Sequence, residues 1–344
     1  MSDDDGVEDT PNDESVQSDG LASSSTDLVV EADVPDEDAA FQNKLEETLK
    51  QAEQDVVDFQ SDGHSEVDAE SWQRAREIVG RFRPVPGFIW RLSYYVLSKP
   101  PGQSPEIGDG MVFGMRRLLY AAASDPLLGS GDKINSVHAA LSALQSDTVA
   151  AITVVHAVCR RLRTAQFERI WRPILDDAVL RSTIGFLVGH HSRNFGPGRG
   201  MLAGFAGRSG LAIQIATGEL EQARQALEEL ALGRLIQDIG AKIYGCGPLQ
   251  VSAMTLSAAG CGRDAAFGTV AYASPDSKEM VGNEEQLKWL AAFAITEHLR
   301  MGEIDKVDPE YWHVLGLAEE ELQEELRLEA HKLSRRGPTW SWIF

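Results

Sequence analysis

Histidine and carboxylate side chains are the first candidates for chemistry, because they bind metal ions and transfer protons. The chain has eight histidines, and none lies in an HExxH, HxH or HxxxH pattern with a nearby carboxylate. His190 and His191 are the only close pair, and adjacent side chains of a helix point about 100° apart, which does not favour one shared ion. Asp176 and Asp177 are paired carboxylates of a kind that is usually solvated on an amphipathic helix.

A glycine-rich segment at residues 196–200 (GPGRG) is the candidate for phosphate binding. It lacks the Lys-Ser/Thr pair of a P-loop and follows no predicted strand, so we interpret it as a flexible connector. The cysteines Cys159, Cys246 and Cys261 are scattered among small or apolar residues, which predicts buried, reduced thiols. The sequence therefore predicts no catalytic residue, no cofactor and no metal ligand.

The acidity of the chain is confined to its first quarter. Residues 1–70 hold 23 of the 53 acidic and 2 of the 32 basic residues, so residues 71–344 hold 30 of each and are neutral. Residues 1–40 are rich in Asp, Glu, Ser and Thr with almost no aromatic residue, which predicts a disordered acidic tail. Because such a tail repels polyanions, we expect no nucleic-acid partner.

Residues 41–70 are predicted to be an amphipathic helix followed by a linker. Apolar residues recur there at helical spacing and would form one stripe on an acidic helix. The stripe consists of Phe41, Leu45, Leu49, Ala52, Val56 and Phe59. Such a stripe could bind a partner helix, although packing on the chain's own domain is the more ordinary expectation. The chain begins without a signal-peptide pattern, and we expect a cytoplasmic protein with no membrane span.

Residues 71–335 are predicted to be one helical domain, so the fold class is all-α. Glycine and proline separate apolar stretches of helical period, and no stretch shows the alternation of a strand. The C-terminal residues 336–344 are unusually aromatic and are expected to pack on the chain's own surface. The predicted helices cover residues 71–83, 87–98, 110–124, 136–145, 147–166, 167–191, 199–216, 219–233, 249–259, 264–273, 282–301, 309–313 and 318–335.

Seven short segments stand out along roughly residues 75–330. They are 83–88 (RPVPGF), 115–122 (MRRLLYAA), 133–141 (KINSVHAAL), 170–172 (IWR), 203–211 (AGFAGRSGL), 244–253 (YGCGPLQVSA) and 312–322 (WHVLGLAEEEL). In this order they resemble motifs of the HDOD domain, a regulatory relative of the HD phosphohydrolases. The resemblance implies a multi-helix HD-like fold and a role in bacterial signal transduction.

The resemblance also implies that metal ligands of the HD enzymes are missing here. Pro173 stands at the place of the first histidine, and Gly207 and Arg208 stand at the place of the His-Asp pair. Glycine offers no ligand, and an arginine beside the site repels a cation. We therefore expect a non-enzymatic regulatory scaffold that acts through protein partners of a signalling pathway.

Two other functions stay open from the sequence. A metal-dependent phosphohydrolase with a rearranged site would use residues from two places in the chain, Asp176 with Asp177 and His190 with His191. A nucleotide or small-anion sensor would use the old cleft without chemistry, with Arg172, Arg208 and residues 196–200 around the anion, because the guanidinium group presents a forked set of donors.

Overall fold

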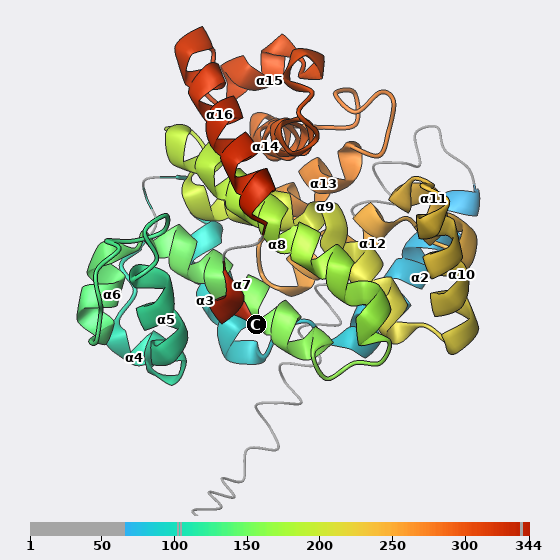
Figure 1. Cartoon of the computed structure of the whole chain (residues 1–344), viewed down its shortest axis with the longest axis horizontal. Coiled ribbons are helices and arrows are strands. Elements are labelled where there is room, and N and C mark those ends of the chain that lie inside the picture. Colours follow the sequence, from blue (N-terminus) through green and yellow to red (C-terminus); the bar gives the residue numbers. More distant parts are fainter. Residues whose placement is uncertain (1–65, 102, 104, 338–339) are drawn as a thin grey trace, which may run out of the picture.

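Every regular element is a helix in the part of the chain that the structure describes (Figure 1). This computed structural model describes residues 66–101, 103, 105–337 and 340–344, and the predicted all-α class is confirmed there. In chain order the helices are α2 (Glu66–Phe82), α3 (Gly87–Leu97), α4 (Asp109–Val112), η1 (Phe113–Met115), α5 (Arg116–Ala123), α6 (Val137–Ala143), α7 (Ser146–Leu162), α8 (Glu168–His191), α9 (Pro197–Thr217), α10 (Leu220–Ala231), α11 (Ile236–Tyr244), α12 (Pro248–Ala258), α13 (Arg263–Ala271), α14 (Glu284–Met301), η2 (Ile304–Lys306), α15 (Pro309–Val314), α16 (Glu320–Arg336) and η3 (Ser341–Ile343).

The starts of several helices follow directly from local sequence. Ser136, Asn283 and Asp308 each accept a backbone N–H bond in the first turn of α6, α14 and α15. Proline occupies the first turn of α9, α12 and α15, where its missing N–H costs nothing. Most observed helix boundaries therefore lie within a few residues of the predicted ones.

Two predicted helix limits near the start of the domain were wrong. The helix expected to start after Ser71 begins at Glu66, and the Ser71 hydroxyl instead accepts a hydrogen bond of 2.8 Å from Nε2 of Gln250 on α12. The single helix expected over residues 110–124 is broken into α4, η1 and α5.

Helix α11 was not among the predicted helices, because a glycine such as Gly240 is typical of a helix end. In the structure Gly240 is buried inside α11, and the helix ends at Gly245, whose φ of 74° is in the left-handed region. A Cβ atom on Gly240 would lie 2.3 Å from Cδ of Pro248. The glycine is therefore required by the close approach of α11 to α12.

Helices α8 and α9 form the centre of the fold and pack along each other (Figure 1). A Cβ atom on Gly185 of α8 would lie 2.1 Å from the carbonyl oxygen of Gly200 on α9, and a Cβ atom on Gly200 would lie 2.1 Å from the carbonyl oxygen of Gly185. The two backbones are thus in direct contact. Helices α7, α12 and α14 pack around α9 and complete the core.

The glycine-rich segment 196–200 is the start of α9, so the prediction of a flexible connector was wrong. The N–H of Gly198 donates a 2.9 Å hydrogen bond to Oδ2 of Asp147, a buried residue of α7. A Cβ atom on Gly198 would lie 2.1 Å from the Asp147 carbonyl oxygen. The chain's own carboxylate therefore occupies the positive end of this helix.

The aromatic C-terminal segment packs on the chain itself, as expected. Trp340 and Ile343 are fully buried. Nδ1–H of His156 on α7 donates a 2.7 Å bond to the Ile343 carbonyl, and Nη1 of Arg163 donates a 2.6 Å bond to the backbone oxygen of Phe344. These contacts fix the segment beside α7.

Other predictions concern residues that the structure does not describe or features that it does not decide. The acidic tail of residues 1–40 and the amphipathic helix of residues 41–59 lie outside the described residues. The domain limits at residues 70/71 and 335/336 stay predictions.

Among the described helices none alone is long and apolar enough to cross a bilayer. Only the bent pair α6 and α7, at 109° to each other, meets that length and composition when taken together.

Candidate functional site

Five charged side chains from three central helices gather at one place. Asp177 and Arg181 come from α8, Arg208 from α9, and Glu297 and Arg300 from α14. The first two are four residues apart and so lie on one face of their helix. We call these five residues the ionic cluster.

Every carboxylate oxygen of the ionic cluster lies close to a guanidinium nitrogen. Oδ1 of Asp177 lies 2.9 Å from Arg300, and Oδ2 lies 2.9 Å from Arg181 and 3.2 Å from Arg208. Oε1 of Glu297 lies 2.5 Å from Nη1 of Arg181, and Oε2 lies 3.3 Å from Nη1 of Arg208. The three arginines and two carboxylates thus form one continuous network, with a net charge of 3 − 2 = +1.

Burial makes this network sensitive to the loss of any partner. The Arg181 side chain is 2 % exposed and that of Glu297 12 %. Burial opposes ionisation of Asp177, but Arg181, Arg300 and Arg208 outweigh it and hold the pKa of that carboxyl below its usual range. Burial lowers the pKa of Arg208, and Glu297 works against that effect. The charged groups therefore depend on one another for their ionised state.

Gly207 leaves the space that the Glu297 carboxylate occupies. A Cβ atom on Gly207 would lie 2.5 Å from Oε1 of Glu297 and 3.6 Å from Cδ of Arg181. A larger side chain at this position would displace the carboxylate from its guanidinium partners. Thus both Gly207 and Arg208, which the sequence singles out, belong to the surroundings of the ionic cluster.

Arg172 lies in a different environment from Arg208. Its Nε is 2.9 Å from Oδ1 of Asp176, and its guanidinium carbon lies 3.9 Å from the centroid of the Phe344 ring. Asp176 and Asp177 therefore face different partners although they are adjacent in sequence. The structure does not bring the two arginines to one anion, and Pro173, next to Arg172, is exposed on α8.

Donors of residues 196–200, which were candidates for binding an anion, form hydrogen bonds within the chain. Besides the Gly198 bond to Asp147, Arg199 is buried and uses its guanidinium group on backbone carbonyls. It donates to the carbonyls of Phe195 at 3.2 Å and Leu97 at 3.1 Å, and also to that of Lys99. The Gly198 N–H and the Arg199 guanidinium group are therefore used within the fold.

His190 and His191 end α8 far from the paired aspartates. The rise of about 1.5 Å per residue puts His190 roughly 20 Å along the helix from Asp176. The two imidazole rings are perpendicular, with centroids 5.6 Å apart, and His190 also stacks on Phe186. The four residues named for a rearranged hydrolase site are therefore not brought together.

The three cysteines are buried. All three are free thiols. Burial raises the pKa of Cys246 to about 11 and that of Cys261 to about 12, and it also raises the pKa of Cys159. The thiols are protonated at neutral pH, as predicted for structural cysteines.

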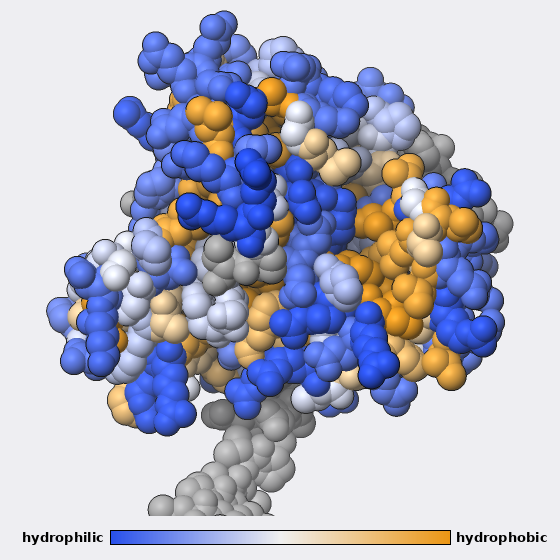
Figure 2. Space-filling view, in the orientation of Figure 1, coloured by the Kyte–Doolittle hydropathy of each residue, from blue (hydrophilic) through white to orange (hydrophobic). Residues whose placement is uncertain are grey.

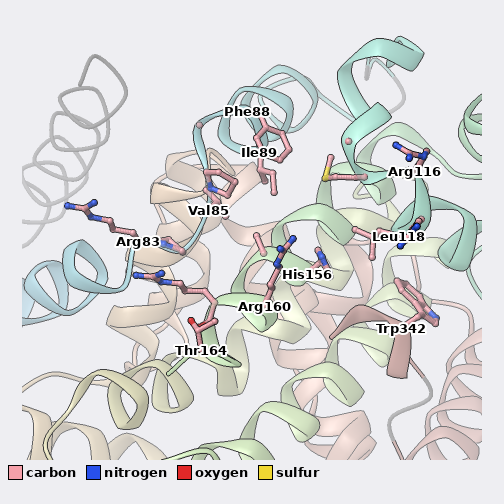
Figure 3. A pocket seen from close by; sticks show the side chains of 18 of the residues that line it. Arg83, Val85, Phe88, Ile89, Arg116, Leu118, His156, Arg160, Thr164 and Trp342 are labelled. Atoms are coloured by element: carbon pink, nitrogen blue, oxygen red, sulfur yellow. The ribbon is translucent and has the colours of Figure 1, made fainter. Parts of the chain in front are cut away.

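A groove of about 1190 Å³ lies along the second half of α7 (Figure 3). Its walls are the α2–α3 connection and the start of α3, the stretch from η1 into α5, the second half of α7, and Trp342 of the C-terminal segment. Apolar side chains lie between these walls, including Val85, Ile89, Met115 and Leu118. The sequence did not predict this groove, because its walls come from four separate parts of the chain.

Five arginines line the groove, and no aspartate or glutamate does. We call it the arginine groove. None of the five forms an ion pair within the described part of the chain, although Arg161 donates to the Phe82 carbonyl at 3.0 Å and Arg116 to the Phe113 carbonyl at 3.4 Å. They are Arg83, Arg116, Arg117, Arg160 and Arg161.

Comparisons with known proteins identify the fold. No protein-family model matches the sequence. No curated protein matches it either. Among solved structures, an HDOD domain protein of unknown function from Geobacter sulfurreducens superposes with a TM-score of 0.58 at 14 % identity, over 77 % of this chain and 96 % of that one. The fold is HDOD-like.

Two further structures share the HDOD-like fold. A protein of Marinobacter aquaeolei VT8, provisionally described as a signal transduction protein, matches with a TM-score of 0.57 at 15 % identity, over 78 % of this chain and 63 % of that one. A protein of Shewanella amazonensis SB2B, provisionally described as a phosphohydrolase, matches with a TM-score of 0.52 at 13 % identity, over 76 % of this chain and 97 % of that one.

The residues of this HDOD-like fold do not fit a divalent metal ion at the ionic cluster. A metal needs several histidine, cysteine or carboxylate ligands that converge on one point. The described residues contain no group of three or more such side chains with that arrangement. The two carboxylates at the cluster already bind guanidinium groups, and the net charge of the cluster repels a cation.

Proposed function

We propose that the chain is a non-catalytic regulatory domain of a bacterial signalling pathway, located in the cytoplasm and acting through protein partners. The observation that carries this proposal is the ionic cluster. Its four carboxylate oxygens are all held by arginines, beside the Gly207-Arg208 pair that stands where the resemblance places a His-Asp pair. The neighbour described as a signal transduction protein supports the pathway class.

The proposal attributes a structural role to the charged residues that an enzyme would use for catalysis. In a hydrolase, carboxylates of the central helices would be free to bind metal, and the metal would activate water. Here a metal would have to displace Arg181 from both Asp177 and Glu297. That exchange would leave a guanidinium group buried without a partner, which costs several kcal/mol.

The test is metal content and hydrolysis measured on the same preparation of the full chain. Elemental mass spectrometry after dialysis against Mn²⁺, Mg²⁺ or Zn²⁺ is expected to find less than one ion per chain, and a panel of phosphate esters is expected to stay intact. Stoichiometric metal together with turnover would refute the proposal and favour the phosphohydrolase function of the Shewanella neighbour.

A matched pair of variants sharpens this test. Arg208→Asp replaces one cation of the ionic cluster by a potential ligand, whereas Arg224→Asp makes the same charge change at an exposed site on α10. If the arginines exclude metal, only the first variant is expected to gain affinity for Mn²⁺, read by the paramagnetic broadening of nearby signals. Equal behaviour of the two variants would mean that the arginines are not what keeps metal out.

A further inference from the structure

The arginine groove lacks the counter-charge that the rest of the domain provides for its cations. Arg83, Arg117 and Arg160 are exposed and have no carboxylate partner among the described residues. By contrast, residues 71–344 as a whole contain equal numbers of acidic and basic residues. A cluster of unpaired arginines over apolar side chains is suited to an acidic ligand with an apolar face.

Arg83 forms the turn at one wall of the groove. It has a φ of 50°, in the left-handed region that favours glycine. Its N–H closes the end of α2 by donating to the Val79 carbonyl at 2.9 Å. This turn places the exposed Arg83 side chain at the groove.

The chain itself contains a segment with matching properties at residues 41–59. In helical projection its apolar stripe is bordered by Glu46 and Glu53 on one side and by Asp55, with Lys44 beside it, on the other. The arginine groove has the reciprocal pattern, with apolar residues between arginines of the α2–α3 connection, α5 and α7 (Figure 3). As a helix, the 19 residues would be about 28 Å long.

The length of the connection also fits. Residues 60–65 separate the segment from Glu66, and a chain of that length spans about 24 Å when extended. Helix α2 is about 25 Å long and leads directly to Arg83. The connection can therefore return along α2 and bring Phe59 near Arg83 when it is fully extended.

We infer that the arginine groove binds residues 41–59 of the same chain, with the apolar stripe on the groove floor and the acidic residues against the arginines. In this arrangement the segment covers the groove until a competing acidic partner displaces it. The regulatory meaning rests on the proposed function, whereas the intramolecular contact itself does not.

Another exposed surface is a less suitable place for the segment. Figure 2 shows an apolar area over α10 and its surroundings, where Leu220, Leu227, Leu232 and Leu235 are between 49 % and 72 % exposed. The cations beside it already pair with glutamates, Arg224 with Glu221 and Lys242 with Glu229, so no surplus of positive charge is left there for an acidic segment. The charges thus favour the arginine groove.

The first experiment is amide hydrogen exchange on the full chain and four variants. Protection of residues 41–59 is expected in the unmodified chain and is expected to fall about tenfold in Arg117→Glu/Arg160→Glu. The control Arg335→Glu/Arg336→Glu makes the same charge change at exposed residues of α16 and is expected to keep the protection. Glu46→Lys/Glu53→Lys is expected to lose protection, and combining it with the groove variant is expected to restore part of it.

A second measurement keeps the inference testable if a variant is unstable. A fluorescent peptide of residues 41–59 is added to the full chain and to the variant Leu45→Asp/Leu49→Asp, whose own segment is disabled. Stronger peptide binding to the variant, weakened by 0.5 M salt, is expected because the groove is then vacant and its attraction is partly electrostatic.

Several outcomes would overturn the inference. Exchange of residues 41–59 at the rate of an unstructured peptide in the unmodified chain would do so. Protection that rises with protein concentration would assign the groove to a second copy. Protection lost in Leu220→Asp/Leu227→Asp but kept in the groove variant would place the segment on α10. Binding of inorganic phosphate that depends on Arg117 and Arg160, with exchange of the segment unchanged, would make the groove a small-anion site.

These results are separable from those on the proposed function. Metal content and ester hydrolysis report on the ionic cluster, whereas exchange of residues 41–59 reports on the groove. A chain that binds metal could still cover its groove, and a metal-free chain could leave it open.

Discussion

In the ionic cluster between α8, α9 and α14 each guanidinium group lies against a carboxylate, whereas none of the five guanidinium groups in the arginine groove does so within the described residues. The two regions also differ in solvent exposure: the Arg181 side chain is 2 % exposed, and the groove arginines are exposed. A buried charge needs an opposite charge within the fold, because removing it from water is costly. An exposed charge stays hydrated and does not need a partner in the folded chain. The comparison separates arginines that maintain structure from arginines that are available for binding.

The largest effect is expected from breaking the ionic cluster. Glu297→Ala leaves Arg181 and Arg208 each with Asp177 alone and is expected to lower the free energy of unfolding by about 3–5 kcal/mol, because a buried cation loses a partner. Urea denaturation of the full chain measures this. As a control, Glu303→Ala removes an exposed partner of Lys306 and should change little. Equal effects would show that burial does not distinguish the cluster.

A smaller effect is expected from adding a methyl group in each region. Gly207→Ala puts a Cβ atom 2.5 Å from Oε1 of Glu297, and the resulting shift is expected to cost about 1–3 kcal/mol. Gly114→Ala, at the wall of the arginine groove, has no atom within 4 Å of its new Cβ and is expected to leave stability nearly unchanged. Thermal unfolding of both variants checks the difference, and a stable Gly207→Ala variant would contradict the close packing around the cluster.

The pH dependence of stability is expected to include a contribution from His156, which lines the arginine groove. Burial lowers the pKa of His156 from its ordinary value near 6.5, and Arg160 and Arg163 lower it further, against the bond to the Ile343 carbonyl. The unfolded chain then binds more protons than the folded one as the pH falls through about 6.5, so stability is lost below that pH. His156→Gln is expected to show a smaller loss of unfolding free energy between pH 7.5 and pH 5.5. An unchanged loss would mean that other groups, such as His298, carry it.

The smallest effect is expected from removing the groove charges themselves. Arg117→Gln and Arg160→Gln are expected to change the unfolding free energy by no more than about 0.5 kcal/mol, because neither residue has an ion-pair partner among the described residues and exposed ion pairs with residues 41–59 would contribute little. The same denaturation experiment measures this. A large loss of stability would place these arginines with those of the cluster and would remove the basis of the comparison.

The helices could be predicted because their signals are local. Prolines and polar caps mark the starts of α9, α12, α14 and α15, and apolar periodicity marks their faces. The predictions of a helix end at Gly240 and of a connector at residues 196–200 were wrong. In both places glycine permits close backbone contact inside or at the start of a helix. A single sequence does not distinguish such a glycine from one that ends a helix.

The candidate sites could be predicted only in fragments. The Asp177–Arg181 pair follows from helical spacing, but Glu297 and Arg300 lie more than a hundred residues further along the chain. The two arginines predicted as possible anion contacts each pair with a different aspartate, Arg172 with Asp176 and Arg208 with Asp177. The arginine groove depends on tertiary placement and carried no sequence signal.

The backbone contact between α8 and α9 has a mechanical consequence. Where two helices touch through Gly185 and Gly200 there are no side-chain rotamers to absorb a displacement, so a push on one helix moves the other. Helix α8 also meets the C-terminal segment, where Arg172 lies over the Phe344 ring. We therefore expect a displacement of the C-terminal segment that moves α8 to move α9 as well, because the two helices are in backbone contact.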